Sequence, residues 1–315
     1  MDQIKYKALI YTVELGGLTK AAEVLGYTQS GISHMISSLE KDCGVQLLYR
    51  DRAGVQLTSA GQQLLPYFQA VCSSQHQLDM MLKGILGEQT GLLRIASHTS
   101  IAAQWLPGIF DTFQTLYPYV NFELREVVTN DETRKLLRRG SVDCGFTDAP
   151  CADKDLDQVH LHKDALVAVV SLDHELANAD YFPLDALDAY PYIKLEETPG
   201  TANEFTQLVD KIFISHGKIP HIKFSVRDEY TVMAMVSNHH GFSILPQMMT
   251  WGKKNSQLAC LPLETHYYRN IYFVTTQWMK NALLIPQFRE CAQSWVAAKY
   301  PLNSLSNPED KLHTT

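Results

Sequence analysis

Residues 16–61 read GGLTKAAEVLGYTQSGISHMISSLEKDCGVQLLYRDRAGVQLTSAG, and their spacing of apolar, hydroxyl and glycine residues decides the fold of the first part of the chain. Thr19 is suited to cap a short helix over residues 20–25, and Gly26 suits the left-handed residue that closes it. Thr28 can then cap a further helix, whose inner face carries three apolar residues at helical spacing: Ile32, Ile36 and Leu39. Two helices joined by a tight, glycine-containing turn are typical of a helix-turn-helix.

The outward face of the helix after Thr28 carries side chains that suit DNA. Glutamine can form paired hydrogen bonds to adenine, serine hydroxyls reach bases or phosphates, and histidine can donate to either. The first amides of a helix also favour phosphate. The alternative is a helical hairpin that only packs, with its polar residues in water. The residues expected to contact DNA are Thr28, Gln29, Ser30, Ser33 and His34, and all of them except Thr28 are expected to enter the major groove.

A basic hairpin is predicted directly after this helix. Residues 45–49 and 55–57 look like two short strands, and residues 50–54 form the turn between them. The turn carries Arg50 and Arg52, which are expected to contact phosphate or the minor groove. Because a hairpin that only packs has no need of a basic wing, these arginines favour DNA binding over the packing alternative.

Residues 4–65 as a whole resemble the winged helix-turn-helix of LysR-type transcriptional regulators. The residues that carry this resemblance are Ala21, Ala22, Gln29, Ser33, Leu39, Glu40, Gly44, Leu57, Thr58 and Gly61. The chain departs from the family pattern at Ser30-Gly31, where the family usually has a proline and then a small residue. It departs again at His34-Met35, where the family often has a basic residue. The resemblance implies the fold, while these departures leave open which bases the helix prefers.

One long helix is predicted over residues 59–88, with Ser59 as its cap. Apolar residues fall on alternating steps of four and three, the spacing that drives two helices to pair. The expected seam consists of Leu64, Phe68, Val71, Gln75, Leu78, Leu82 and Ile85. Gln75 would fix the register, and Pro66 is expected to kink the helix or delay its regular part. The pattern alone also allows a helix packed on its own domain, whereas the LysR-type resemblance implies a dimerisation helix.

From residue 91 to about residue 300, apolar strand-like runs alternate with amphipathic helices, which predicts a parallel sheet covered by helices. This part resembles the effector domain of the same family. The resemblance implies an α/β domain of two Rossmann-like subdomains, similar to a type II periplasmic binding protein, with crossings near residues 163–167 and 269–273. The expected organisation is a winged helix-turn-helix over 1–58, a linker helix over 59–88, an effector domain over 91–301 (subdomain I about 91–163 and 270–301, subdomain II about 166–267), and a loose tail over 302–315.

A ligand site is expected at the carboxyl ends of the effector-domain strands, where helices begin. Free amides and hydroxyls at such points suit a small carboxylate or a similar anion. The candidate effector-binding residues are Ser97, His98, Thr99, Ser100, Thr147, Thr198, Thr201, Arg227 and Thr231. Arg227 and Thr231 lie in the segment where the resemblance implies pocket residues. For any one of these residues, a helix cap that faces water is an equal alternative.

Metal, redox and catalytic chemistry have weaker support. Two pairs of histidines stand close in the sequence, namely His160 with His162 and His239 with His240. No Cys cluster or HExxH motif accompanies them, so neither a metal nor a cofactor is expected. Cys144 and Cys151 bracket a loop, which leaves a thiol-based redox regulator of the same fold as an alternative function. The chain has no GxSxG, P-loop or GxGxxG motif, so a small-molecule enzyme is the weaker alternative.

Composition sets the wider limits. The chain has 315 residues, 45% of them hydrophobic and 19% charged, which predicts two or more domains and excludes wholesale disorder. No secretory signal follows the first residues and no apolar run of about 18 residues occurs, so no membrane partner is expected. The six scattered cysteines fit reduced thiols, and we expect a cytoplasmic protein.

The net charge of −7, taken alone, argues against nucleic acid as a partner, because phosphate binding depends on lysine and arginine. Residues 1–65, however, hold six basic and six acidic side chains, so the whole excess of negative charge lies outside the DNA-reading module. The sequence therefore predicts a sequence-specific, DNA-binding transcriptional regulator whose activity a small-molecule effector modulates. The expected partners are double-stranded DNA at an inverted-repeat promoter site, the effector, further copies of the chain in a dimer and an implied tetramer, and RNA polymerase as a candidate.

Overall fold

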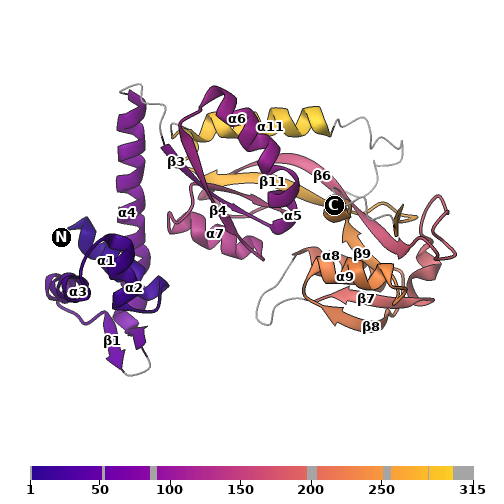
Figure 1. Ribbon diagram of the computed structural model, residues 1–315, viewed down its shortest axis with the longest axis horizontal. Coiled ribbons are helices and arrows are strands. Elements are labelled where there is room, and N and C mark those ends of the chain that lie inside the picture. Colours follow the sequence, from indigo (N-terminus) through magenta and orange to yellow (C-terminus); the bar gives the residue numbers. More distant parts are fainter. Residues whose placement is uncertain are drawn as a thin grey trace. The chain divides into compact units, whose positions relative to one another are not determined.

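The computed structural model describes residues 2–51, 54–85, 91–196, 204–250, 257–282 and 284–300. Two compact units make up the chain, one of residues 1–89 with 135–143 and the other of the remainder (Figure 1). Among the described helices, none combines the length and the apolar character that crossing a bilayer requires. The predicted tail over residues 302–315 lies outside the described part of the chain.

The first unit contains three short helices, a two-stranded hairpin and one long helix. These elements are α1 (Gln3–Glu14), α2 (Leu18–Leu25), α3 (Gln29–Cys43), β1 (Leu48–Asp51), β2 (Gly54–Leu57) and α4 (Ser59–Ile85). The stripe predicted on α3 lies at the centre of the core, since Ile32, Ile36 and Leu39 are fully buried. Tyr6 of α1 stacks on Phe68 of α4, with ring centroids 4.8 Å apart. Contacts among α1, α3 and the start of α4 therefore build one apolar core.

The predicted cap of the first short helix is wrong. Helix α2 begins two residues before the predicted range, and its N-cap is Gly17, which offers no side-chain hydrogen bond. Thr19 therefore lies inside the first helical turn. The other two predictions here are confirmed: Gly26 closes α2 with a φ of 72°, and Thr28 caps α3 by accepting the amide of Gly31 at 3.1 Å.

The first strand of the hairpin begins later than predicted, because the residues just before it are hydrogen-bonded to Glu40, near the end of α3. The Val45 amide still donates to the Glu40 carbonyl. The Glu40 carboxylate then accepts the amides of Leu47 and Leu48 at 2.8 and 3.1 Å. Residues 45–47 thus complete the end of the helix, and antiparallel pairing of β1 with β2 starts only at Leu48.

Helix α4 is continuous from Ser59 onward and contains Pro66, so the predicted delay of the helix is wrong. A proline removes one backbone hydrogen bond. Two residues after Pro66, the ring of Phe68 stacks on Tyr6 of α1, and this contact packs the same part of α4 against α1. The cap is also different from the prediction. Thr58, rather than Ser59, accepts the Gly61 amide at 2.9 Å, and its hydroxyl donates to the Gln46 carbonyl at 2.7 Å.

The second unit contains a mixed sheet in the strand order β10-β6-β11-β5-β3-β4, with β9 also paired to β6. Its strands are β3 (Gly91–Ser97), β4 (Val120–Glu126), β5 (Cys144–Thr147), β6 (Leu156–Ser171), β9 (Ser243–Pro246), β10 (Leu258–Pro262) and β11 (Tyr268–Thr276). Strand β6 connects two lobes, because residues 156–165 pair with β11 whereas residues 166–171 pair with β9 and β10.

Two long helices cover the first lobe. Helices α6 (Leu106–Leu116) and α11 (Ile285–Lys299) lie side by side (Figure 1). The rings of Phe113 and Phe288 are fully buried between them and the sheet, in an edge-to-face contact with centroids 5.3 Å apart. The short helix α5 (Thr99–Gln104) follows β3 directly, and α7 (Asn130–Arg138) begins after β4.

The second lobe has its own core around a parallel pair of strands. Strand β7 (Pro191–Leu195) pairs with β8 (His221–Val226). The helical segments of this lobe are η1 (Leu184–Asp188), α8 (Glu204–Ser215), α9 (Glu229–Ser237) and α10 (Gln247–Thr250). The rings of Phe182 and Phe242 stack at 4.8 Å in the core. Gly241 allows the chain to pass Pro191, since a Cβ there would lie 2.2 Å from the Pro191 carbonyl oxygen.

The predicted parallel sheet is correct for only some of the strand pairs. Strand β3 is parallel to β4 and β5, as the alternation of strands and helices predicts. Strand β11, however, is antiparallel to both β5 and β6. The reason is the connectivity: the chain leaves the first lobe along β6 and returns along β11, so these neighbours run in opposite directions. Strands β7 and β10 and helix α8 had no counterpart in the prediction.

Candidate functional site

Helix α3 presents an exposed polar face opposite its buried stripe. Gln29, Ser30, His34 and Ser37 are exposed, and Ser33 is half-buried. These side chains offer hydrogen-bond donors and acceptors, which is the chemistry that reads the edges of bases. Since the buried stripe fixes the rotation of the helix about its axis, the polar face points away from the core.

The first turn of α3 is held by its cap. The Thr28 hydroxyl oxygen accepts the Gly31 amide and lies 3.1 Å from the hydroxyl of Ser30. Both hydroxyl groups are exposed. Thr28 therefore caps α3 without any partner molecule, and a contact between Thr28 and DNA would be a second role for this residue.

The hairpin next to α3 is tied closely to α4. A Cβ on Gly61 would lie 2.2 Å from the Leu47 carbonyl oxygen, so only glycine allows α4 to pass the chain before β1 at this distance. The backbone of Arg50 pairs with Val55 across the hairpin. The side chain of Arg50 and the whole of Arg52 lie outside the described part of the structure.

The predicted seam of α4 divides into two parts. Leu64 and Phe68 pack against the core of the first unit. Val71, Leu78 and Leu82 are 49%, 51% and 48% exposed. Gln75 lies within the exposed part, between Val71 and Leu78, and donates to Asp79 of its own helix at 3.0 Å. The side chain of Ile85 is outside the described residues.

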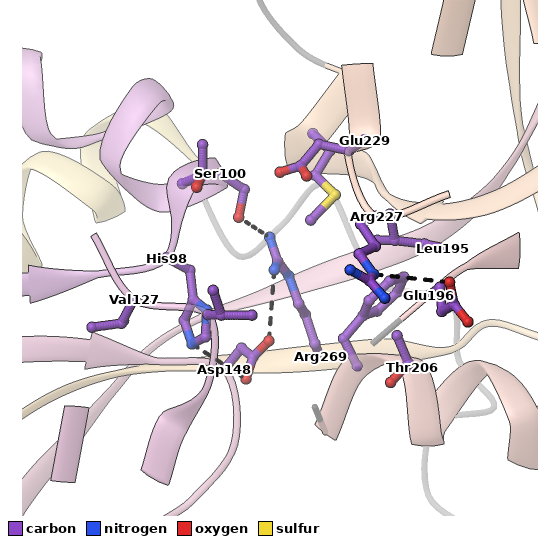
Figure 2. A pocket seen from close by; sticks show the side chains of 14 residues that line it. His98, Ser100, Val127, Asp148, Leu195, Glu196, Thr206, Arg227, Glu229 and Arg269 are labelled. Carbon is purple, nitrogen blue, oxygen red and sulfur yellow. Dashed lines mark hydrogen bonds and ion pairs between the residues drawn. The ribbon is translucent and has the colours of Figure 1, made fainter. Parts of the chain in front are cut away.

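A pocket of about 200 Å³ opens in the second unit, and residues of both lobes line it. Most of the lining follows the carboxyl ends of β3, β4, β5, β7 and β8, and the rest comes from α8, α10 and β11 (Figure 2). The described lining residues are His98, Thr99, Ser100, Val127, Val128, Asp148, Leu195, Glu196, Phe205, Thr206, Arg227, Glu229, Met249 and Arg269.

Arg269 is the most extensively bonded charged group of the pocket, and only 3% of it is exposed. Its Nε donates to Asp164 Oδ2 at 2.8 Å and its Nη2 donates to the Ser100 hydroxyl at 3.0 Å. Its Nη1 lies 3.7 Å from Asp148 Oδ2. Asp164 also accepts the amide of Met248 at 3.0 Å. One arginine thus links β11, β6, α5 and, through Asp164, α10.

A second buried network of His98, Asn130 and Asp148 lies beside this arginine. Asn130 Nδ2 donates to Asp148 Oδ1 at 2.7 Å, and Asn130 Oδ1 accepts the Asp148 amide at 3.1 Å. The same Asn130 oxygen lies 3.0 Å from His98 Nε2. Because an amide oxygen only accepts, the network assigns a proton to His98 Nε2.

The second lobe contributes the more exposed charged groups of the pocket. Arg227 Nε lies 3.9 Å from Glu196 Oε2, and both side chains are about half exposed. Glu229 lines the same side of the pocket. In Figure 2, Arg227 and Glu196 lie on the opposite side of Arg269 from His98. Solvent screens this exposed ion pair, so it holds the pocket less firmly than the buried network does.

The structure brings together some of the predicted effector residues and not others. Those that line the pocket are His98, Thr99, Ser100 and Arg227. Ser97 and Thr147 are fully buried instead, and their hydroxyls donate to the carbonyls of His98 and Ala149. Thr231 donates to the Asp228 carboxylate in the cap of α9 and lines a separate, open hollow. Thr198 and Thr201 lie outside the described residues.

The sequence reasoning missed the two most deeply buried charges of the pocket, Asp148 and Arg269. Asp148 follows Thr147 at the end of β5, so its position at the end of a strand was a usable signal. Arg269 lies on the strand that returns to the first lobe. No sequence pattern shows that its charge is buried, because its partners lie 105 and 121 residues before it in the chain.

The cysteines do not form an activated thiol site. Cys144 and Cys151 are both buried, and neither forms a disulfide. Burial raises the pKa of the Cys151 thiol, which lowers the population of the reactive thiolate. Within the described ranges, no group of three or more His, Cys, Asp or Glu side chains is placed to hold a metal ion.

Comparisons with known proteins agree with this architecture. Residues 5–62 match the family model of bacterial regulatory helix-turn-helix proteins of the lysR family, and residues 86–297 match that of the LysR substrate binding domain. YvbU of Bacillus subtilis, described as an uncharacterised transcriptional regulator of the helix-turn-helix type, is 26% identical over 301 residues, which cover 95% of this chain and 100% of that protein.

Two solved structures show the same fold over nearly the whole chain. A full-length OxyR variant from Pseudomonas aeruginosa aligns with a TM-score of 0.74 at 16% identity, over 94% of this chain and 95% of that one. The LysR family transcriptional regulator CbnR aligns with a TM-score of 0.68 at 20% identity, over 94% of this chain and 99% of that one. With family models matched over both its units, the chain belongs to the LysR family and is a DNA-binding transcriptional regulator with an effector-binding domain.

Proposed function

We propose that the polar face of α3 enters the major groove and reads the operator. The observation that carries this proposal is the row of exposed hydrogen-bonding side chains opposite a fully buried stripe. Arg50 and Arg52 of the hairpin would contact phosphate or the minor groove and so position the helix. The side chains proposed to contact bases or nearby phosphates are Thr28, Gln29, Ser30, Ser33 and His34.

The apolar side chains of α4 support a dimer. Val71, Leu78 and Leu82 lie at heptad spacing and remain about half exposed on a helix whose first turns are already packed. Such a row favours pairing with the same helix of a second copy. Two heads can then bind two half-sites of an inverted repeat, and a tetramer would be a pair of such dimers. Leu78→Glu is expected to dissociate the pair in analytical ultracentrifugation. Ser74→Glu, exposed on the same helix outside the seam, should leave it intact.

The pocket of the second unit is the proposed effector site. Its lining comes from both lobes, and Arg269 connects elements of both. A small molecule that fits one arrangement of the lobes better than another would shift their population. That shift would change how the DNA-binding heads of the oligomer are presented to the operator. The domain boundaries expected from the sequence are part of this proposal.

The regulator is proposed to act without catalysing a reaction. The relatives it matches are described as transcriptional regulators, and its pocket network has the partners of a binding site rather than a nucleophile with an adjacent base. A regulator that must reach the chromosome would work in the cytoplasm. Contact with RNA polymerase would be needed only if the protein activates transcription.

Thiol redox sensing is the second candidate function, and the buried thiols argue against it. Because burial raises the pKa of Cys151, attack on peroxide should be slow. Peroxide should therefore leave the mobility of the protein on a non-reducing gel unchanged. A mobility shift that disappears in a Cys144→Ser variant would instead establish the redox function.

The proposal can be tested by selecting double-stranded DNA from a random pool with the full-length protein. Enrichment of an inverted repeat, with half-site centres about 10 base pairs or a multiple of that apart, would support a dimer that reads two major grooves. Footprinting on the selected site then shows whether the protein covers both half-sites. Recovery of unrelated sequences, all with equal affinity, would contradict sequence-specific reading by α3.

A further inference from the structure

Strand β4 forms one end of the sheet. It pairs in parallel with β3 over its whole length of seven residues, and in the described part of the chain no strand pairs with its outer edge. The pairing has no register shift, and the strand contains no proline. A regular, uncovered edge presents a row of backbone donors and acceptors to a further strand, so native proteins usually cover or interrupt it. The outer edge of β4 is therefore a candidate surface for a partner.

The register with β3 shows which backbone groups reach the outer edge. The Val127 amide, just after β4, donates to the Ser97 carbonyl of β3 at 3.1 Å. Backbone direction alternates along a strand with a period of two residues, so the odd-numbered residues of β4 also face β3. The even-numbered residues Phe122, Leu124 and Glu126 therefore direct their N–H and C=O groups to the outer edge.

Apolar and charged side chains of β4 are exposed near this edge. Leu124, in the middle of the row, is 38% exposed, and Tyr119, directly before β4, is 71% exposed. The side chains of Glu123 and Arg125 are 37% and 57% exposed. An exposed apolar surface beside an uncovered strand edge is typical of an interaction site. The charges of β4 then decide which partner strand fits.

The charges of β4 are complementary to their own reversed order. Glu123 and Arg125 lie on the same face of the strand, where Arg125 Nε donates to Glu123 Oε1 at 2.9 Å. They flank Leu124 on either side. In an antiparallel pair of two β4 strands centred at Leu124, Glu123 of each copy therefore lies directly opposite Arg125 of the other. These are non-hydrogen-bonded pairs, in which side chains approach most closely, and opposite charges at such positions stabilise the pairing.

The neighbouring registers lose this match. The backbone groups of the outer edge meet only when the register shifts by two residues at a time. A shift in one direction places Glu123 opposite Glu123 of the second copy, and a shift in the other direction places Arg125 opposite Arg125. Like charges directly opposite each other are destabilising. The two-fold register about Leu124 is therefore the one that the charges of the strand favour.

We propose that the second unit carries a self-complementary interface, in which β4 pairs antiparallel with β4 of a second copy about Leu124. The same surface is used on both copies, so the pair closes with two-fold symmetry. The pairing of β4 does not depend on the exposed row of α4. Only the tetramer that the two interfaces would build together rests on the proposed function, in which α4 holds the first dimer.

The test is sedimentation velocity of the full-length protein over a dilution series, with Leu78→Glu in every variant to remove the α4 pair. We expect Leu78→Glu to form a dimer that β4 holds together. Adding Glu123→Arg places arginine opposite Arg125, and adding Arg125→Glu places glutamate opposite Glu123. Each addition should raise the dimer dissociation constant about tenfold or more. An equimolar mixture of the two should associate again, because every cross-strand pair then joins opposite charges.

The mixture separates pairing between copies from a change within one copy. Neither variant regains a matched strand by itself, so a defect of folding would persist in the mixture. Asp180→Arg and Lys154→Glu are the matched controls, since both residues are exposed elsewhere in the second unit and the net charge changes by the same amounts. These controls should dimerise like Leu78→Glu alone. Unchanged dimerisation of the β4 variants, or a mixture that stays monomeric, would overturn the proposal.

A cross-link locates the two-fold axis. Hydrogen-bonded partners in an antiparallel pair have Cα atoms about 5.5 Å apart, which is within the range that a disulfide spans. Leu124→Cys should therefore give a covalent dimer on a non-reducing gel after treatment with a mild oxidant. Leu172→Cys, which is also exposed, is the control and should stay monomeric on the gel. Equal cross-linking of the two variants would reject Leu124 as the centre of the pair.

The outcome can be told apart from failure of the proposed function. If Leu78→Glu is monomeric at every concentration, β4 does not pair with itself and its edge is left to a strand of another protein. If Leu78→Glu and the wild type form the same oligomer, the α4 dimer is wrong, and the charge variants of β4 still test this interface. Random-pool selection of DNA tests α3 independently of both surfaces.

Discussion

The polar face of α3 and the effector pocket differ in how their residues come together. The face of α3 lies within one helix of 15 residues, so a helical period is enough to group its side chains. The pocket combines residues from position 98 to position 269, taken from two lobes. A surface built by one element can be read from local spacing, whereas a pocket built by many strands exists only after folding.

The two regions also differ in what their side chains do for stability. The side chains of Gln29 and His34 are exposed and have no hydrogen bond to another described residue, so they can bind a partner. Asp148, Asp164 and Arg269 are buried and hold each other in place. Substitutions on α3 should therefore change binding, while substitutions of the buried charges should first change folding.

The largest effect is expected from Arg269→Met. The change leaves two buried carboxylates without their partner, which costs about 3–5 kcal/mol of unfolding free energy. Urea denaturation of the full-length protein measures this loss. Arg227→Met lines the same pocket from an exposed position and should cost less than about 0.5 kcal/mol. Equal losses in the two variants would show that burial of Arg269 does not govern its contribution.

Gly61→Ala tests whether the stability of the DNA-binding unit depends on close backbone packing, as the stability of the pocket is expected to depend on its buried charges. The new methyl group would meet the Leu47 carbonyl oxygen at 2.2 Å, so we expect about 1–3 kcal/mol of destabilisation. Gly17→Ala has open space around its Cβ and an extended φ of 177°, and should cost about 1 kcal/mol or less. Thermal unfolding compares the two. A Gly61→Ala variant as stable as Gly17→Ala would contradict the close approach.

A smaller effect distinguishes two threonines that look alike in the sequence. Thr28→Ala removes the hydrogen bond to the Gly31 amide and should lower the unfolding free energy by about 1 kcal/mol. Thr19→Ala replaces a residue inside the first turn of α2, where alanine is the better helix former, and should be neutral or slightly stabilising. If Thr19→Ala lowered the unfolding free energy more than Thr28→Ala, the cap would lie at Thr19, as the sequence suggested.

The fold of the DNA-binding unit could be predicted closely because its signals are local. The apolar stripe of α3, the cap at Thr28 and the left-handed Gly26 all follow from spacing within a few residues. The errors have local causes too. Glycine can occupy an N-cap position, so the hydroxyl of Thr19 was a misleading signal. The Glu40 carboxylate accepts the amides of Leu47 and Leu48, so strand pairing in the hairpin begins later than the sequence predicts.

The pocket could be predicted only in part, because its chemistry depends on distant partners. The rule that ligands bind at the carboxyl ends of strands correctly predicted that His98, Thr99 and Ser100 line the pocket. The same rule placed Ser97 and Thr147 in the site, although their hydroxyls are turned to nearby carbonyls. The charge balance of the lining was not accessible at all, because it depends on which aspartates share an arginine more than 100 residues further along the chain.

The most direct test of the account is the affinity of the full-length protein for its selected DNA site, measured by fluorescence anisotropy for Gln29→Ala and for Gln62→Ala. Gln29 lies on the exposed face of α3, and Gln62 is an exposed glutamine of α4. If α3 reads bases, Gln29→Ala should weaken specific binding by about 1–3 kcal/mol, or roughly 5- to 150-fold, at an unchanged melting temperature, and Gln62→Ala should bind like the wild type. Equal affinity of the wild type and Gln29→Ala would contradict the assignment of α3 as the recognition helix.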